Sequence, residues 1–185
     1  PLIGIHNIRN SVAAAAVALT VGITINDIKD GLLKFNGVQR RFNKIFSLNG
    51  VDFYDDYAHH PTEIKMTLDG VKKVYKDYEK VCVFQPHRIS RLRDLRREFS
   101  FSFRNADMVI LCPVYSAGEK IKLGFSYFKF AKEIIKNSKV RLFLIKDNIQ
   151  LAKFVKKNIY GKKIVIGMGA GTISNWMREL PKLMK

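Results

Sequence analysis

Cysteine, acidic residues and long apolar runs are all scarce in this chain of 185 residues, and each shortage excludes a class of protein. The two cysteines, Cys82 and Cys112, lie in apolar runs, which indicates buried free thiols in a reducing compartment and excludes a disulfide framework. No apolar run reaches the roughly 18 residues that cross a bilayer, so a membrane-spanning protein is excluded. The opening segment PLIGIHNIRN also lacks the basic-then-apolar layout of a signal peptide.

The shortage of acidic residues leaves the chain strongly basic. Sixteen Asp and Glu stand against 33 Lys and Arg, which gives a formal net charge of +17. The basic residues are scattered, and no recognition helix, zinc finger or aromatic platform accompanies them. We therefore interpret most of this charge as a solvated surface. A nucleic-acid-binding α/β module and a site for a polyanionic small molecule remain as alternatives.

The spacing of apolar residues predicts an α/β fold over most of the chain. Strands are expected at 51–57, 80–85, 107–114, 140–145 and 163–167, and helices at 61–78, 90–104, 127–137, 148–158 and 173–184. This alternation is typical of βαβ units and predicts a Rossmann-like domain with a mostly parallel sheet. The runs VCVF and MVILC are continuously apolar, as expected for strands that helices cover on both faces.

The first part of the chain has a different pattern. The alanine-rich segment 7–21 predicts a helix that ends at Gly22, and a second helix is expected from Asn26, as its N-cap, to about Leu33. The following segment, FNGVQRRF at 35–42, has an Asn-Gly turn and no helical period. We interpret it as a linker between two domains.

Polar residues gather where the expected strands end, which is where ligands bind in open parallel sheets. Three of the four histidines follow expected strands, whereas chance placement would scatter them. The candidates are Asp56, Tyr57, His59 and His60 at and after the end of the first strand, His87 and Arg88 after the second, and Tyr115 and Ser116 after the third. Arg88 and Arg91 are the arginines nearest the end of the second strand, and arginine can make bidentate contacts with phosphate or carboxylate.

The segment DDYAHHPTEI at 55–64 allows three interpretations: a metal site, a polar binding loop or a plain helix cap. Adjacent histidines usually point in different directions and no third ligand is evident, so we favour the polar binding loop. Pro61 suits the first turn of the following helix. The glycine-rich GMGAGT at 167–172 matches neither phosphate-loop pattern and predicts a tight strand-to-helix turn.

Asn7 and Asn10 are three residues apart and so share one face of the first expected helix. Their side chains could read a nucleobase edge or cap the helix equally well.

Taken together, six motifs in order resemble the Mur ligase family of peptidoglycan synthesis. They are HNIRNSVAAAAVA (6–18), FNGVQRRF (35–42), DDYAHHPTEI (55–64), FQPHRISR (84–91), PVYSAGE (113–119) and GAGTISNW (169–176). They extend over nearly the whole chain. The match is nearest to the branch that adds L-alanine, because the peptide-adding branch shares the HN and AHHPT elements but looks less similar at FQPHRISR.

The resemblance implies one part of a three-domain enzyme of the bacterial cytoplasm. Residues 1–36 would be the end of a central ATPase domain and residues 37–185 the complete C-terminal domain. The glycine-rich phosphate loop, the Mg²⁺ ligands and the UDP-binding domain would lie outside this chain, so no metal site is expected within it. The abrupt start at Pro1 fits a fragment that folds but does not catalyse ligation alone.

The family reaction joins L-alanine to the carboxylate of UDP-N-acetylmuramate and consumes ATP through an acyl phosphate. By motif match, ATP would contact Asn7, Asn10, Arg41 and Asp56, with Asn7 near adenine and Asp56 at the ribose. The acceptor carboxylate and the alanine would contact Tyr57, His59, His60, His87 and Arg88, with Tyr115 and Ser116 as secondary candidates. His60 and Arg88 are the expected pair for the anionic reactants.

Overall fold

Runs of apolar residues form a six-stranded sheet in the computed structural model, which describes residues 4–119 and 126–185. The strands are β1 (Asn43–Leu48), β2 (Val51–Asp56), β3 (Glu79–Phe84), β4 (Met108–Leu111), β5 (Arg141–Leu144) and β6 (Lys163–Met168). Their order is β1-β2-β6-β3-β4-β5, and neighbours are parallel except for β1 and β2. The expected α/β fold with a mostly parallel sheet is therefore confirmed.

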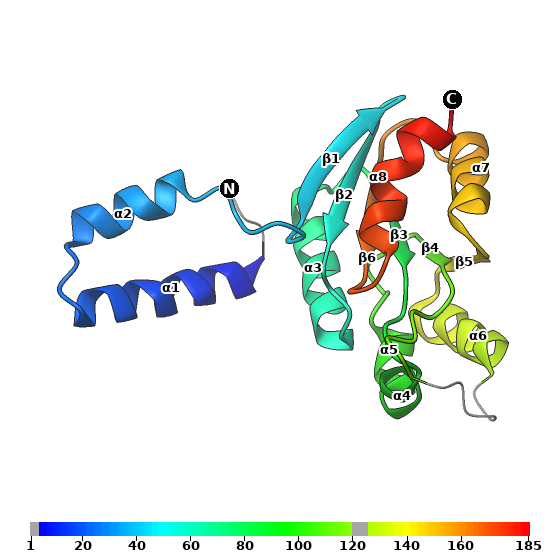
Figure 1. The fold of residues 1–185 in the computed structure, drawn as a ribbon, viewed down its shortest axis with the longest axis horizontal. Helices are drawn as coiled ribbons and strands as arrows, with labels where there is room; N and C mark the ends of the chain where they lie inside the picture. Colours follow the sequence, from blue (N-terminus) through cyan, green and yellow to red (C-terminus); the bar gives the residue numbers. More distant parts are fainter. Residues whose placement is uncertain (1–3, 120–125) are drawn as a thin grey trace.

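The helices form a separate arm and two layers on the sheet (Figure 1). The arm consists of α1 (Ile5–Thr20) and α2 (Ile25–Lys34). The remaining helices are α3 (Pro61–Val74), α4 (Ile89–Asp94), α5 (Arg96–Phe101), α6 (Tyr127–Ser138), α7 (Asn148–Asn158) and α8 (Ile173–Leu183). Because the sheet is covered on both sides, its central strands are apolar on both faces.

Two apolar cores hold these layers together. On one face, Cys82 and Phe84 of β3 pack in a cluster with residues of α3, α5 and α6. On the other face, Val81 and Val83 pack with residues of α7 and α8. All four side chains are fully buried, which confirms that the VCVF strand is covered on both sides. Cys82 and Cys112 are buried and free, as expected from their apolar surroundings.

The parallel strands bring their carboxyl ends to one edge of the sheet, where α3, α4 and α8 begin. Pro61 occupies the first turn of α3, as predicted. Searching the described stretches of the chain for a helix long and apolar enough to cross a membrane finds none.

Strand β1 was not expected from the sequence. It pairs antiparallel with β2, and none of its residues is buried, so it lacks the continuous apolar run that marks the inner strands. Asn49 and Gly50 join the two strands, both with positive φ (50° and 77°), which is the conformation of a tight hairpin turn.

Several helix boundaries also differ from expectation, and α3, expected to reach residue 78, ends at Val74. The N-cap of α2 is Thr24, whose hydroxyl accepts the Asp27 N–H at 3.2 Å, and not Asn26. The helix expected at 90–104 is two short helices with a bend at Leu95. Leu92 and Phe99, on either side of the bend, both lie in the core, where each is 1% exposed.

Leu111 and Leu144 provide a matched test of the core, because they are paired on the neighbouring strands β4 and β5. Leu111 is fully buried, whereas Leu144 is 42% exposed. We expect Leu111→Ala to lower the free energy of unfolding by about 2–5 kcal/mol, through lost burial and a cavity. Leu144→Ala should cost less than about 1 kcal/mol. Denaturant unfolding measures both free energies. Equal losses of stability in the two variants would contradict the burial of Leu111 and the exposure of Leu144.

Candidate functional site

The carboxylate of Asp56, at the end of β2, joins the linker to the sheet. Its Oδ2 accepts the backbone N–H of Phe42 at 2.9 Å, and its Oδ1 accepts that of Ala58 at 2.7 Å. The residue is only 4% exposed. Burial raises the pKa of Asp56 to about 6, although the two N–H groups and the charge of Arg41 oppose this rise. Asp56 is thus a buried acid that titrates close to neutral pH.

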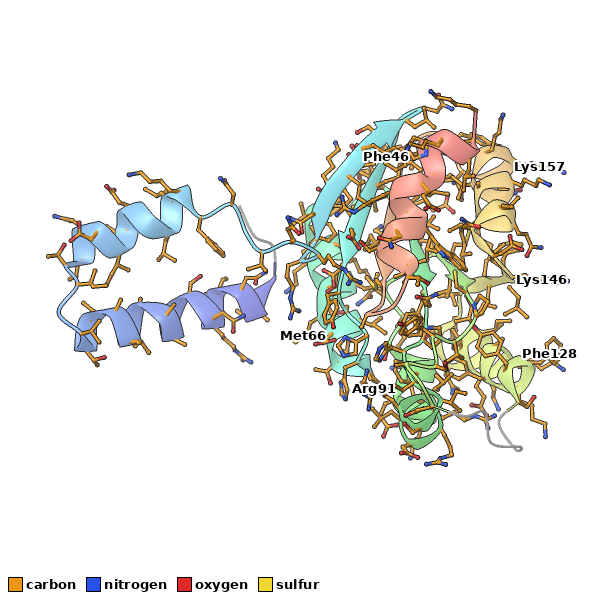
Figure 2. All side chains as sticks on the ribbon, in the orientation of Figure 1. Phe46, Met66, Arg91, Phe128, Lys146 and Lys157 are labelled. Carbon is orange, nitrogen blue, oxygen red and sulfur yellow. The ribbon has the colours of Figure 1, made fainter. Side chains whose placement is uncertain are left out.

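A cavity of about 580 Å³ lies between the helical arm and the sheet domain. Its lining residues include Asn7, Asn10, Arg41 and Asp56, which are the four positions predicted to contact ATP. The walls also carry apolar side chains, among them Leu32, Phe35, Val38, Phe42 and Met66, of which Met66 is labelled in Figure 2. A largely apolar cavity with a few convergent polar groups is typical of a small-molecule site. The structure therefore brings together all four predicted nucleotide residues.

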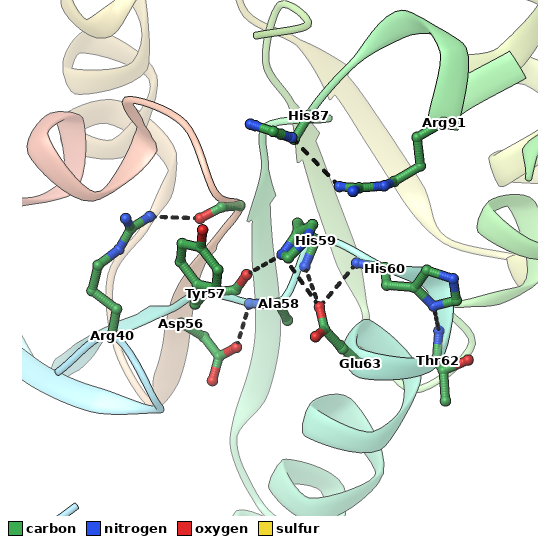
Figure 3. Close-up of polar contacts among 11 residues, drawn as sticks. Arg40, Asp56, Tyr57, Ala58, His59, His60, Thr62, Glu63, His87 and Arg91 are labelled. Atoms are coloured by element: carbon green, nitrogen blue, oxygen red, sulfur yellow. Dashed lines mark hydrogen bonds and ion pairs between the residues drawn. The ribbon is translucent and has the colours of Figure 1, made fainter. Parts of the chain in front are cut away.

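The loop after β2 orients His59 through two contacts (Figure 3). The Nδ1 atom of His59 lies 2.9 Å from the carbonyl oxygen of Tyr57 and 3.4 Å from Oε2 of Glu63. Because a carbonyl oxygen only accepts, this hydrogen bond requires Nδ1 to carry the proton. The Nε2 atom of a neutral His59 is then the acceptor available to a ligand.

His60 has a different environment from His59. Its Nδ1 accepts the Thr62 N–H at 3.3 Å, while Glu63 Oε2 accepts the N–H groups of His59 and His60 at 2.9 and 3.1 Å. This is a capping box at the start of α3. In Figure 3 the His60 ring points away from His59 and His87. The Nδ1 atom of His60 therefore serves as a helix cap. If His60 contacts a bound substrate, it would do so through Nε2.

Glu63 connects this cap to the cavity, which it also lines. Burial favours its protonated form, but the His59 N–H, the charge of His59, the His60 N–H and the charge of Arg41 outweigh burial and keep the pKa of Glu63 below its usual value. Glu63 is therefore a carboxylate at neutral pH.

His87 and Tyr115 extend the sheet beyond β3 and β4. The Tyr115 N–H donates to Pro86 O and the Arg88 N–H to Tyr115 O, both at 2.8 Å. The His87 and Tyr115 rings stack with centroids 5.5 Å apart, and the His59 ring lies 5.8 Å from the His87 ring. Three candidates from three strand ends thus form one cluster.

Arg91 approaches this cluster from α4, with Nη1 3.4 Å from Nδ1 of His87 (Figure 3). Burial and then the positive charge of Arg91 lower the pKa of His87. His87 is therefore neutral at physiological pH, and Nδ1 accepts from the guanidinium.

Arg88, Ser116 and Tyr57 reach the edge in different ways. Arg88 is the N-cap of α4 with φ of 69°, an uncommon backbone conformation for a residue with a side chain, and its side chain is exposed. Ser116 is half-buried, and its carbonyl accepts the Glu119 N–H at 3.1 Å. The half-buried Tyr57 ring lies 5.1 Å from the His59 ring.

Gln85, which sequence reasoning missed, holds the turn after β6 against β3. Its Oε1 accepts the Ile173 N–H, and its Nε2 donates to Thr172 Oγ1, both at 3.0 Å. The turn lies so close that a Cβ on Gly171 would stand 2.6 Å from Gln85 Oε1 and from Tyr115 Cγ. The prediction of a tight strand-to-helix turn at 167–172 is therefore confirmed. A polar residue directly after an apolar strand was the available signal for Gln85.

Metal binding has no support among the side chains that the structure describes. No group of three or more His, Cys, Asp or Glu side chains is arranged to hold an ion. The two histidines and two aspartates of residues 55–60 do not converge, because Asp55 accepts from Ser174 and Arg178 while Asp56 accepts from backbone.

The packing of the turn against Tyr115 predicts a local effect of adding one methyl group. Gly171→Ala would push against Gln85 and Tyr115 and should cost about 1–3 kcal/mol of unfolding free energy. Gly31→Ala, in helix α2, has open space around its Cβ and should raise stability by up to about 1 kcal/mol. Thermal unfolding of both variants measures the difference. Unchanged stability in Gly171→Ala would show that the turn is loosely packed.

Comparison with known proteins identifies relatives over the whole chain. The UDP-N-acetylmuramate–L-alanine ligase of Pelagibacter ubique (strain HTCC1062) is 68% identical over 184 residues, which is 100% of this chain and 40% of the relative. The enzyme of the same name from Brachyspira hyodysenteriae is 43% identical over 187 residues, again 100% of this chain and 40% of the relative. The chain therefore spans about 40% of the length of these curated relatives.

Solved structures show the same fold. The UDP-N-acetylmuramate–alanine ligase of Thermotoga maritima superposes with a TM-score of 0.78 at 26% identity, covering 97% of this chain and 37% of that chain. A murein peptide ligase of Psychrobacter arcticus gives 0.71 at 22% identity, over 98% and 37%, which is a likeness of fold alone. The family described as "Mur ligase, glutamate ligase domain" matches residues 40–171. Because this match extends over more than half of the chain, the chain belongs to the Mur ligase family.

Proposed function

We propose that this chain is the C-terminal part of an enzyme that joins L-alanine to the carboxylate of UDP-N-acetylmuramate. The reaction would convert ATP to ADP and phosphate in the bacterial cytoplasm. The observation that carries the proposal is the 68% identity, over the whole chain, to a relative named for this reaction. Residues 1–36 would complete a central ATPase domain, and residues 37–185 would form the C-terminal domain.

ATP would occupy the cavity between the helical arm and the sheet domain. Its volume of about 580 Å³ is in the range of small-molecule sites. Asn7 and Asn10 offer amide donors and acceptors for the adenine edge, and Arg41 offers a cation for phosphate. Both oxygens of Asp56 already accept a backbone N–H, and each retains a lone pair for a ribose hydroxyl.

The acceptor carboxylate and the alanine would bind at the adjoining cluster of His59, His87 and Tyr115. A neutral His87 beside Arg91 and the nearby Arg88 provide donors for an anionic group. Tyr57, His60 and Ser116 complete the candidate set.

The proposed chemistry proceeds in two steps. The muramate carboxylate attacks the γ-phosphate of ATP and gives an acyl phosphate, and the alanine amine then displaces phosphate through a tetrahedral intermediate. Phosphoryl transfer depends mainly on positioning and on stabilising charge, which suits a site made by two domains. Closure over the ATP domain would also protect the acyl phosphate from water.

Mg²⁺ would be held outside this chain. The described residues offer no cluster of ligands for it, so we assign no step to a metal here.

The proposal predicts activity only when the missing part is restored. In a chimera, residues 1–185 would replace the matching segment of the Pelagibacter ubique relative, to which they are 68% identical. We expect phosphate release that needs ATP, UDP-N-acetylmuramate and L-alanine together, and none from residues 1–185 alone. Activity with another amino acid in place of alanine would contradict the proposed substrate, and ligation by the isolated segment would contradict its role as a part.

The raised pKa of Asp56 predicts how ATP binding depends on pH. Its carboxylate form accepts ribose hydroxyls, so affinity should be full above pH 6 and fall as pH drops through 6. One unit below that pKa about nine-tenths of the groups are protonated, which predicts a loss of about tenfold.

Calorimetric titration of the chimera with ATP measures this dependence. Asp56→Asn should bind ATP weakly at every pH, and the ratio of its affinity to that of the parent should be constant above about pH 7 and should rise as pH falls below about 6. The ligand's own titration cancels in that ratio, and a ratio that stays constant between pH 5 and 7 would exclude the proposed role.

A further inference from the structure

Arg40 connects three segments that are far apart in the sequence (Figure 3). Its carbonyl oxygen accepts the Tyr57 N–H at 2.6 Å, and its Nη2 donates to the carbonyl of Gly169 at 2.7 Å. Its guanidinium carbon lies 4.7 Å from the centre of the Tyr57 ring. One side chain therefore contacts the loop after β2 and the turn after β6 while its backbone belongs to the linker.

Arg41 lies between two residues with unusual backbone conformations. Arg40 has φ of 60° and Phe42 has φ of 53°, both in the left-handed region that residues with a Cβ rarely adopt. Phe42 is held there by its N–H bond to Asp56 and by stacking on Tyr54, with ring centroids 4.3 Å apart. Such conformations persist only where surrounding contacts determine them, and they concentrate at functional sites.

The guanidinium of Arg40 gains little from direct ion pairing. None of the ion pairs in the described chain includes Arg40, and its buried Nε has no hydrogen-bond partner there. A buried donor without a partner is destabilising and so calls for an explanation. The planar group is instead held by an aromatic face and a single carbonyl, which suits a flat, weakly hydrated guanidinium better than a compact, strongly hydrated ammonium.

We propose that Arg40 is a positioning residue for the ligation reaction. It holds the linker against the Tyr57 loop and the Gly169 turn, so that Arg41 is presented to the phosphates of ATP in one fixed orientation. Arg40 does not line the nucleotide cavity, whereas Arg41 does. This inference rests on the proposed function, because it assigns Arg40 a role in the same reaction.

The test compares three variants in the chimera with the Pelagibacter ubique relative. Arg40→Ala should lower kcat about 10- to 100-fold, the effect of misplacing one reacting group, while KM for ATP changes less than threefold. Arg40→Lys should lose nearly as much, since charge alone does not restore the stacked, hydrogen-bonded geometry. Arg97→Ala, an exposed arginine on α5, is the matched control and should leave both constants unchanged.

Hydrogen exchange provides a second measurement that does not depend on activity. The Phe42 N–H, bonded to Asp56, should exchange at least tenfold faster in Arg40→Ala, because the linker is then held on one side only. If Arg40→Ala melts below the assay temperature, Arg40→Lys alone decides the comparison.

The two proposals fail in different ways. An unmodified chimera without activity counts against the proposed function. The exchange rate of the Phe42 N–H then tests separately whether Arg40 holds the linker in place. Parental kcat in either Arg40 variant, a rise in KM for ATP as large as the fall in kcat, or unchanged Phe42 exchange would overturn the role of Arg40.

Discussion

The candidate site depends on the hydrogen bonds that the buried carboxylate of Asp56 accepts. It ends β2, accepts the Phe42 N–H of the linker and the Ala58 N–H of the following loop, and lines the cavity against the helical arm. Burying a carboxylate is costly unless hydrogen bonds satisfy it, and here both donors belong to segments that carry candidate ligand-binding residues. The two hydrogen bonds that stabilise the acid therefore also determine where Arg41 and His59 lie.

Much of the fold could be predicted because its inner strands have a simple pattern. The VCVF and MVILC runs are apolar without alternation, which only burial on both faces explains, and the helices between them force parallel pairing. Strand β1 was missed because it is an edge strand with exposed polar residues. The Asn49-Gly50 pair was the signal that would have revealed its hairpin.

The site was predictable in position but not in contacts. Parallel strands end at one edge, so His59, His87 and Tyr115 were expected there, and their rings form one cluster. The role of each residue depends on where its side chain points, and the spacing of residues in the sequence does not determine that direction. His59 and His60 are adjacent residues of the same type, yet only His60 caps α3 through Nδ1. Arg40 and Arg41 are likewise adjacent, yet Arg40 bonds to Gly169 while Arg41 lines the cavity. The positive φ values of Arg40 and Phe42 could not be predicted, because neither residue is a glycine.

We propose that the arm, the linker and the strand ends together form one nucleotide site. A crystal structure of the chimera with a non-hydrolysable ATP analogue and UDP-N-acetylmuramate tests it most directly. We expect adenine against Asn7 and Asn10, the ribose hydroxyls at Asp56 and the phosphates within reach of Arg41. A nucleotide bound elsewhere, with this cavity filled by protein side chains, would contradict the proposed site.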